Sequence, residues 1–239
     1  MRTPLFRLGY RTRLLASIFP LLLAGCQTAP QRSTAALLQQ PQPAAQISPS
    51  AARFAVDPQA SEIRVLVYRA GPLARFGHDH VVIGRVRGEI RAGASAATSG
   101  FRLEIPVASF QVDPPAERAE EGAEFAEPVS AQAREGTRHN MLGAGVLDAA
   151  HYPLIRIESL SLAGPRWNPT VTARVTLRGA TRDLRFPAAV FERHDTLTVI
   201  AQFRLDQTEF GIQPFSILGG GLRVRDALDI RLRIVARRA

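Results

Sequence analysis

The residues best suited to chemistry lie in one short segment, Arg75–His80, which reads Arg-Phe-Gly-His-Asp-His. Residues two apart share a face of a β-strand, and His78 and His80 have the same parity as the apolar Val82. If the strand containing Val82 extends back to residue 78, both imidazoles point to its apolar side. Imidazoles in that position can ligate zinc or copper, or hydrogen-bond a phosphate or a quinone carbonyl.

Two observations keep other interpretations of this segment open. A turn before the histidines would free them from the strand, so that His78 and Asp79 cap a loop and His80 is half-buried. A metal site needs at least a third ligand, for which the sequence offers His139, His151 or Asp79. The sequence does not bring these residues together.

The chain's single cysteine, Cys26, ends a segment typical of an export signal. Arginines and no acidic residue precede an apolar stretch at 14–23, which is too short to span a bilayer. Leu23-Ala24-Gly25-Cys26 resembles the bacterial lipoprotein signal, in which the cysteine is acylated, as with palmitate, and becomes the first residue. Ordinary cleavage near Ala24 is the alternative, and it would leave a free thiol in an exported protein.

Acylation of Cys26 would anchor the protein to a membrane, stably if two or more acyl chains are attached. The next residue is Gln27 and not aspartate, which by resemblance to enterobacterial sorting indicates the periplasmic face of the outer membrane. We expect residues 1–25 to be the signal peptide. Residues 26–53, rich in Gln, Pro, Ala and Ser, are expected to form a disordered tether.

The composition argues against a nucleic-acid-binding protein and against a fold held by disulfides. The formal net charge is +9, and all of the basic side chains are arginine because the chain has no lysine. These arginines alternate with acidic and apolar residues and do not cluster with aromatic residues, so we expect no nucleic-acid partner. No cysteine follows Cys26, so the domain has no disulfide and depends on its hydrophobic core.

From Phe54 onward, apolar and polar residues alternate, which indicates β-strands with one buried face. About eight such runs, separated by turn residues, predict an antiparallel barrel or sandwich. The runs lie at 62–69, 82–91, 101–105, 154–162, 171–177, 182–191, 197–205 and 228–234.

One region, 113–150, breaks this alternation, being acidic at first and then polar. We expect short helices near 115–122 and 129–142 that cap one end of the sheet as a lid or entrance. The acidic residues at 117–127 are expected to form a solvated helix face. No internal repeat or second domain is evident, so 54–239 is expected to be a single domain.

Several separated motifs of this domain, in chain order, match one known family. The matching segments are Phe54–Ser61, Gly88, His139–Leu142 with Val146–Ile155, Leu177–Arg182, Arg204–Ile212 in a looser form, and Val224–Ile230. In these motifs the domain resembles the YceI-like family of periplasmic polyisoprenoid-binding proteins, over about residues 54–239.

The resemblance implies an all-β fold, an eight-stranded antiparallel lipocalin-like barrel with short helices at one end. It also implies a function, which is to hold the chain of an isoprenoid lipid, such as a polyprenyl phosphate or a quinone, in the barrel lumen. A barrel of this size can enclose a small ligand if its inward side chains do not fill it. Periodicity does not distinguish this from a filled barrel, so a ligand-free structural or envelope-stress lipoprotein remains the alternative.

For such a lipid we expect Arg75, His78, His80 and His139 to contact the head group, a role that the family pattern does not require of His78 and His80. A metal-binding protein or metal-dependent hydrolase built on His78 and His80 is another alternative. The sequence holds no glycine-rich phosphate loop, Gly-x-Ser-x-Gly elbow or His-Glu-x-x-His motif. We therefore expect a binding protein and no enzyme, with no cofactor besides the bound lipid. The oligomeric state is not determined by the sequence, which is compatible with a dimer.

Overall fold

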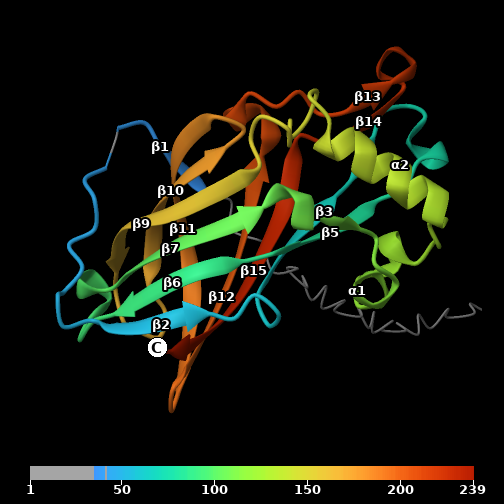
Figure 1. The fold of residues 1–239 in the computed structure, drawn as a ribbon. Helices are drawn as coiled ribbons and strands as arrows, with labels where there is room; N and C mark the ends of the chain where they lie inside the picture. Colours follow the sequence, from blue (N-terminus) through green and yellow to red (C-terminus); the bar gives the residue numbers. More distant parts are fainter. Residues whose placement is uncertain (1–34, 41) are drawn as a thin grey trace, which may run out of the picture. The chain divides into compact units, whose positions relative to one another are not determined.

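The computed structural model describes residues 35–40 and 42–239, and Figure 1 shows a barrel of strands with helices beside one end. The predicted signal peptide, Cys26 and the first part of the predicted tether lie outside the described residues. No helix in the described part of the chain is long and apolar enough to cross a membrane.

The predicted all-β, eight-stranded antiparallel barrel is confirmed. Each strand of the ring is hydrogen-bonded to two antiparallel neighbours, and the last strand pairs again with the first. In order around the ring the strands are β2 (Ala52–Val56), β6 (Arg87–Ala92), β7 (Gly100–Pro106), β9 (Leu154–Ala163), β10 (Thr170–Leu177), β11 (Ala180–Arg193), β12 (Thr196–Asp206) and β15 (Ala227–Arg238).

A second row of strands extends the barrel toward the end that carries the helices. The first half of β15 pairs with β3 (Glu62–Val67), which pairs with β5 (His80–Arg85) and then β8 (Gln111–Val112). The run 82–91, predicted as one strand, is therefore two strands, β5 and β6. The change of register lies near Gly88, which has a φ of +144° and where a Cβ would lie 2.1 Å from the Arg102 carbonyl oxygen. Only glycine suits that position.

The barrel strands bury alternate residues, as their sequence periodicity predicts. On β12, for example, Leu197, Ala201 and Phe203 are buried in the main core inside the barrel. A smaller core lies on the outer face of β3 and β5, where Leu66 and Val81 pack with Phe125. The sheet is therefore apolar on both faces at the end where its second row of strands lies.

The segment 113–150 folds into the two short helices α1 (Pro115–Ala119) and α2 (Ala131–Leu142), joined by the 3-10 helix η4 (Ala123–Phe125). The expectation of a solvated acidic face is wrong for Glu121, whose side chain is only 4% exposed. Its carboxylate lies 2.8 Å from Arg64 Nη1 and 2.9 Å from Arg231 Nη1. These ion pairs hold the segment against β3 and β15.

The predicted disordered tether is ordered in part, because β1 (Ala36–Leu38) pairs antiparallel with β11. The backbone N–H of Gln42 donates to Asp183 Oδ2 at 3.0 Å, and Arg174 Nε donates to Asp183 Oδ1 at 2.9 Å. The expectation of disorder is therefore wrong for this stretch. A strand of three residues is too short to show a period, which is why its sequence gives no signal.

A small separate sheet consists of β13 (Ser216–Ile217), β14 (Leu222–Val224) and β4 (Arg69–Ala70). Two 3-10 helices accompany it, η1 (Ala74–Phe76) and η6 (Leu218–Gly220). The remaining 3-10 helices are η2 (Ala96–Thr98), η3 (Val107–Ser109) and η5 (Gln207–Phe210).

Candidate functional site

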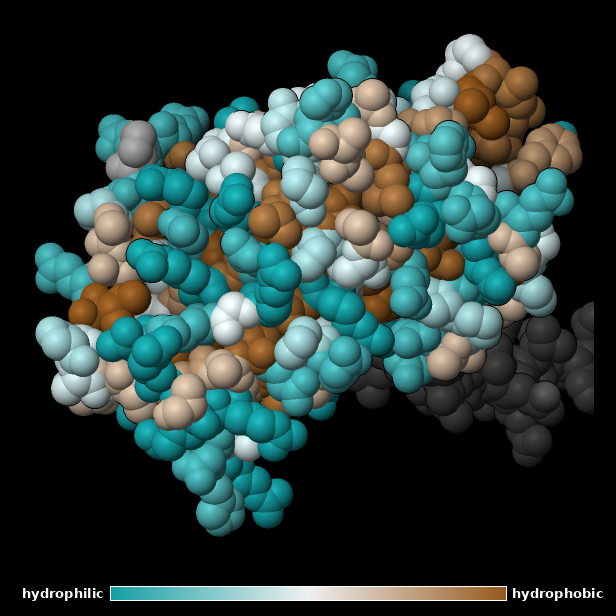
Figure 2. All heavy atoms as spheres, in the orientation of Figure 1, coloured by the Kyte–Doolittle hydropathy of each residue, from teal (hydrophilic) through white to brown (hydrophobic). Residues whose placement is uncertain are grey.

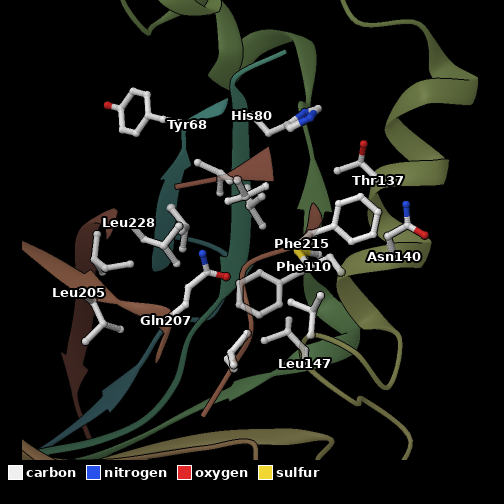
Figure 3. A pocket seen from close by; sticks show the side chains of 18 of the residues that line it. Tyr68, His80, Phe110, Thr137, Asn140, Leu147, Leu205, Gln207, Phe215 and Leu228 are labelled. Atoms are coloured by element: carbon white, nitrogen blue, oxygen red, sulfur yellow. The ribbon is translucent and has the colours of Figure 1, made fainter. Parts of the chain in front are cut away.

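The barrel holds a cavity of about 400 Å³ at the end where the second row of strands lies. Its walls are mainly aliphatic side chains that alternate along β3, β9, β10, β12 and β15, such as Val65, Val175 and Leu228. Figure 3 shows Leu205, Leu228 and the ring of Phe110 around this space. The size falls within the range of small-molecule sites, and the barrel is therefore hollow at this end.

A pair of stacked rings lies at the inner limit of this cavity. Phe186 and Phe203 stack with their centroids 4.4 Å apart and their planes at 22°. Phe203 lines the cavity, whereas Phe186 lines a second and smaller cavity of about 100 Å³ beyond it. We call this pair the floor of the cavity, since it lies between the two spaces.

His80 lines the cavity and is held by buried charges behind it. Its Nδ1 lies 2.6 Å from Oδ2 of Asp113, a carboxylate with no exposed surface. Asp113 Oδ1 accepts hydrogen bonds from Val81 N–H at 2.8 Å and from Arg118 Nη1 at 2.7 Å. An ionised carboxylate only accepts hydrogen bonds, so Nδ1 carries a proton and Nε2 is the nitrogen left for other partners. Figure 3 shows the His80 ring directed toward Thr137 of α2.

The charge state of Asp113 is set by its surroundings. Burial by itself would raise the pKa of this carboxyl group. The hydrogen bonds from His80 and Val81 and the charges of His80 and Arg118 outweigh burial and hold the pKa below its usual range. Asp113 therefore stays ionised and fixes the orientation of the imidazole.

His78 lines the same cavity, but its surroundings differ. Its ring centroid is 6.4 Å from that of His80, and its Nε2 lies 3.8 Å from Glu127 Oε1. Asp79, which the sequence offers as a third metal ligand, accepts a hydrogen bond from the backbone N–H of Arg69 at 2.7 Å. Among the described residues, no group of three or more His, Cys, Asp or Glu side chains is placed to hold a metal ion. The two histidines thus line one cavity, but no third side chain in the described part of the chain is placed with both of them to complete a metal site.

Arg75 and His139, the other two expected head-group residues, are placed elsewhere. The Arg75 guanidinium lies over the ring of Phe76 at 4.5 Å, and Arg75 does not line the cavity. Helix α2 begins after its N-cap Ser130, whose hydroxyl accepts from Ala133 N–H. The helix then presents Thr137 and the residues one turn further on to the cavity, while His139 is exposed outside the lining. The sequence could not predict which face of α2 is turned toward the cavity, because the helix buries no residue fully.

The comparisons with known proteins agree with this architecture. The family model of the YceI-like domain matches residues 54–236. This chain belongs to that family. No curated protein matches the chain.

Solved structures of other proteins are similar to this barrel. BcnA from Burkholderia cenocepacia is 15% identical with a TM-score of 0.53, and the match covers 75% of this chain and 98% of BcnA. A YceI protein from Campylobacter jejuni is 12% identical with a TM-score of 0.47, over 64% of this chain and 81% of that one. At these identities the likeness to BcnA concerns the fold.

The YceI-like barrel also brings polar residues to the cavity that the sequence analysis missed. Tyr68, Arg69, Gln207 and Arg223 all line it. Tyr68 donates from its hydroxyl to Asp229 at 3.0 Å, and Gln207 Nε2 donates to the Arg225 carbonyl at 2.9 Å. The one feature of the sequence that could have indicated these residues is their location, because each lies at or next to the end of a strand.

Proposed function

We propose that this protein binds the chain of an isoprenoid lipid, of the polyprenyl phosphate or quinone type, in its barrel cavity. The observation that supports this is the cavity of about 400 Å³ whose walls are aliphatic and aromatic. Burying an apolar chain there is worth about 0.8 kcal/mol for each CH₂ group, before the costs of binding. Membership of the YceI-like family points the same way.

We assign the head group to the polar residues at the α2 end of the cavity. His80 is fixed by Asp113 with Nε2 available, and the exposed Arg223 supplies a guanidinium at the same cavity. Arginine binds phosphate in a bidentate geometry, whereas His80 Nε2 donates to a phosphate or a quinone carbonyl when the imidazole carries a proton on both nitrogens. His78 completes this set, and Arg75 and His139 are left out of it.

The protein acts in this proposal as a carrier or store and not as an enzyme. We further propose that it is exported and held at the periplasmic face of the outer membrane by acylated Cys26, with residues 27–34 leading to the ordered domain. Mass spectrometry of the N-terminal peptide from the membrane fraction would test this. A Cys26→Ser chain that still fractionates with the membrane through a lipid adduct would contradict it.

The binding proposal is tested by organic extraction of the purified protein followed by mass spectrometry. A prenyl lipid is expected at close to one per chain, and its head group separates the phosphate from the quinone. Leu228→Trp places a large side chain in the cavity and should reduce the retained lipid several-fold. Ile200→Trp, on the exposed outer face of β12, is the matched control and should retain the lipid.

Two results would contradict the proposal. One is an extract without prenyl lipid from a protein that also fails to take up added polyprenyl phosphate or quinone. The other is equal lipid content in Leu228→Trp and Ile200→Trp, with both variants folded by circular dichroism. Elemental analysis of the wild type and of a His78→Ala, His80→Ala variant tests the metal alternative in the same preparations.

A further inference from the structure

The cavity mouth carries exposed apolar side chains that no part of the described chain covers. Leu218 is 71% exposed, Phe76 65%, Ile217 44% and Phe215 38%. Figure 2 shows a hydrophobic cluster at the upper right, where Figure 1 places β13 and β14. We call residues 215–224 the mouth hairpin.

The mouth hairpin and η1 pack as one unit. Strand β14 pairs with β4, and Leu73 N–H donates to the Gly221 carbonyl at 2.8 Å. A Cβ on Gly77, directly after η1, would lie 2.8 Å from Leu222 Cδ1, so the two segments are in close contact. The exposed Phe76 and Leu218 therefore belong to two segments that backbone and packing contacts hold together.

The tip of the hairpin has an unusual conformation for its sequence. Leu218 has a φ of +53°, in the left-handed region, followed by Gly219 at +62° and Gly220 at +92°. Asparagine and glycine adopt that conformation readily, whereas leucine does so at a cost. A leucine that is both strained and exposed gains nothing from the described part of the chain, which indicates an apolar partner beyond those residues.

The two segments that form the tip carry charged side chains of one sign only. Segments 69–78 and 210–225 contain arginines and no aspartate or glutamate. Arg223 and Arg225 are exposed, and Arg75 lies over the Phe76 ring at 4.5 Å. Apolar side chains surrounded by arginines are suited to the interface of an anionic bilayer. There the apolar side chains can insert among the acyl chains, and the lipid phosphates attract the arginines.

The apolar tip is continuous with the cavity. Phe76, Phe215, Ile217 and Arg223 line the cavity as well as the surface around its mouth. We propose that the mouth hairpin and η1 form a membrane-docking surface, which inserts into the interface of an anionic bilayer and places the cavity mouth against it. Lipid exchange as the purpose of docking rests on the proposed function, but docking itself does not.

The test locates the tip relative to a membrane in the full chain. The sole natural cysteine is replaced by Cys26→Ser, and Leu218→Cys or Phe191→Cys then carries the polarity-sensitive fluorophore NBD. Phe191 is 58% exposed on β11, whose end Figure 1 places at the far end of the barrel, so it is the matched control. Both chains carry the same N-terminal segment, so any difference reports on the barrel's orientation.

Vesicles of phosphatidylcholine with 30% phosphatidylglycerol, about the level of an anionic membrane, are expected to shift the emission of NBD at residue 218 to the blue and to slow its quenching by dithionite several-fold. NBD at residue 191 should respond little. Equal responses at the two sites, or none at residue 218, would overturn the proposal. A blue shift at residue 218 without vesicles that grows with protein concentration would also overturn it, because a second copy would then cover the tip.

The arginines are tested separately. Arg75→Gln with Arg225→Gln, at two exposed positions that do not line the cavity, should weaken binding to these vesicles by roughly 10- to 30-fold, since each arginine near an anionic surface contributes about 1 kcal/mol. Arg185→Gln with Arg193→Gln removes the same charge from exposed positions on β11 and should leave binding within about twofold. Equal losses in both pairs would show attraction by net charge alone and contradict a docking surface. Prenyl lipid retained by an undocked protein would leave the proposed function standing.

Discussion

The two ends of the barrel interior are built from different kinds of interaction. At the α2 end, the cavity wall contains His80 backed by the buried Asp113 and Arg118, and the mouth is open to the surface. Toward the other end, Phe186 and Phe203 stack across the lumen. The same alternating strands thus build a polar and adjustable end and an apolar floor. The difference teaches that the polar side chains of the interior come from strand ends and helices, whereas the middle of the strands supplies apolar ones.

The largest expected effect is at the polar end, in Arg118→Met. The substitution leaves the Asp113 carboxylate buried without its guanidinium partner, which typically costs about 3–5 kcal/mol in the free energy of unfolding. Urea denaturation measures the loss. Arg87→Met, which breaks the exposed pair with Glu104, should cost less than about 1 kcal/mol. Equal losses in the two variants would mean that the buried charges do not stabilise this end.

At the floor, Phe203→Ala should destabilise the protein by about 3 kcal/mol and join the two cavities. The free energy of unfolding should fall while the lipid recovered by extraction shifts to longer prenyl chains. Phe191→Ala removes an exposed ring and should change stability by less than about 0.5 kcal/mol. An unchanged distribution of chain lengths would show that the stacked rings do not limit the cavity.

Acid should weaken the fold through two buried carboxyl groups. Burial alone would raise the pKa of Asp113 and of Asp183, but hydrogen bonds from His80 and Arg174 respectively hold each pKa below its ordinary value near 3.8. The unfolded chain then binds protons more readily, so their stabilisation is complete above the unfolded pKa and is lost as the pH falls through the folded one. The urea concentration at the midpoint of unfolding should fall as the pH is lowered from 7 to 3. This fall should be less steep in Asp183→Asn than in the wild type. An identical slope in that variant would contradict this role.

The smallest effect is expected in Arg138→Met, which loosens α2. Arg138 donates to the Phe110 carbonyl at 3.0 Å and to the Ala108 carbonyl at 3.1 Å, so it ties the helix to the barrel. Global stability should fall by about 1 kcal/mol, while amide hydrogens of α2 exchange faster. Arg134→Met removes a contact at 3.5 Å near the start of α2 and is the control. Unchanged exchange in Arg138→Met would show that other contacts hold α2.

Most of the barrel could be predicted from the sequence because burial on one side of a strand leaves a period of two. The alternation of Leu197, Ala201 and Phe203 identified the inner face of β12 correctly. Alternation could not show that 82–91 changes register near Gly88, because parity continues through a bend. It could not detect β1 either, which is too short to show any period.

The candidate site was predicted only in part, for a physical reason. His80 keeps the parity of its strand, so its place at the cavity followed from Val82. Arg75 and His139 lie on 3-10 and α-helical segments, whose rotation depends on contacts with distant residues such as Phe110. Whether the lumen is hollow depends on the sum of side-chain volumes, which a pattern of apolar and polar residues does not contain.

Helix α2 buries none of its residues fully, yet it borders the cavity through Thr137 and Asn140. The strand ring beneath it has no seam, since every strand is bonded on both sides. For a protein that binds a lipid as proposed, a shift of α2 would widen the cavity mouth without breaking any strand pairing of the ring. The rate of ligand exchange would then depend on the contacts of α2, whereas the thermal stability of the fold depends on the closed ring of strands.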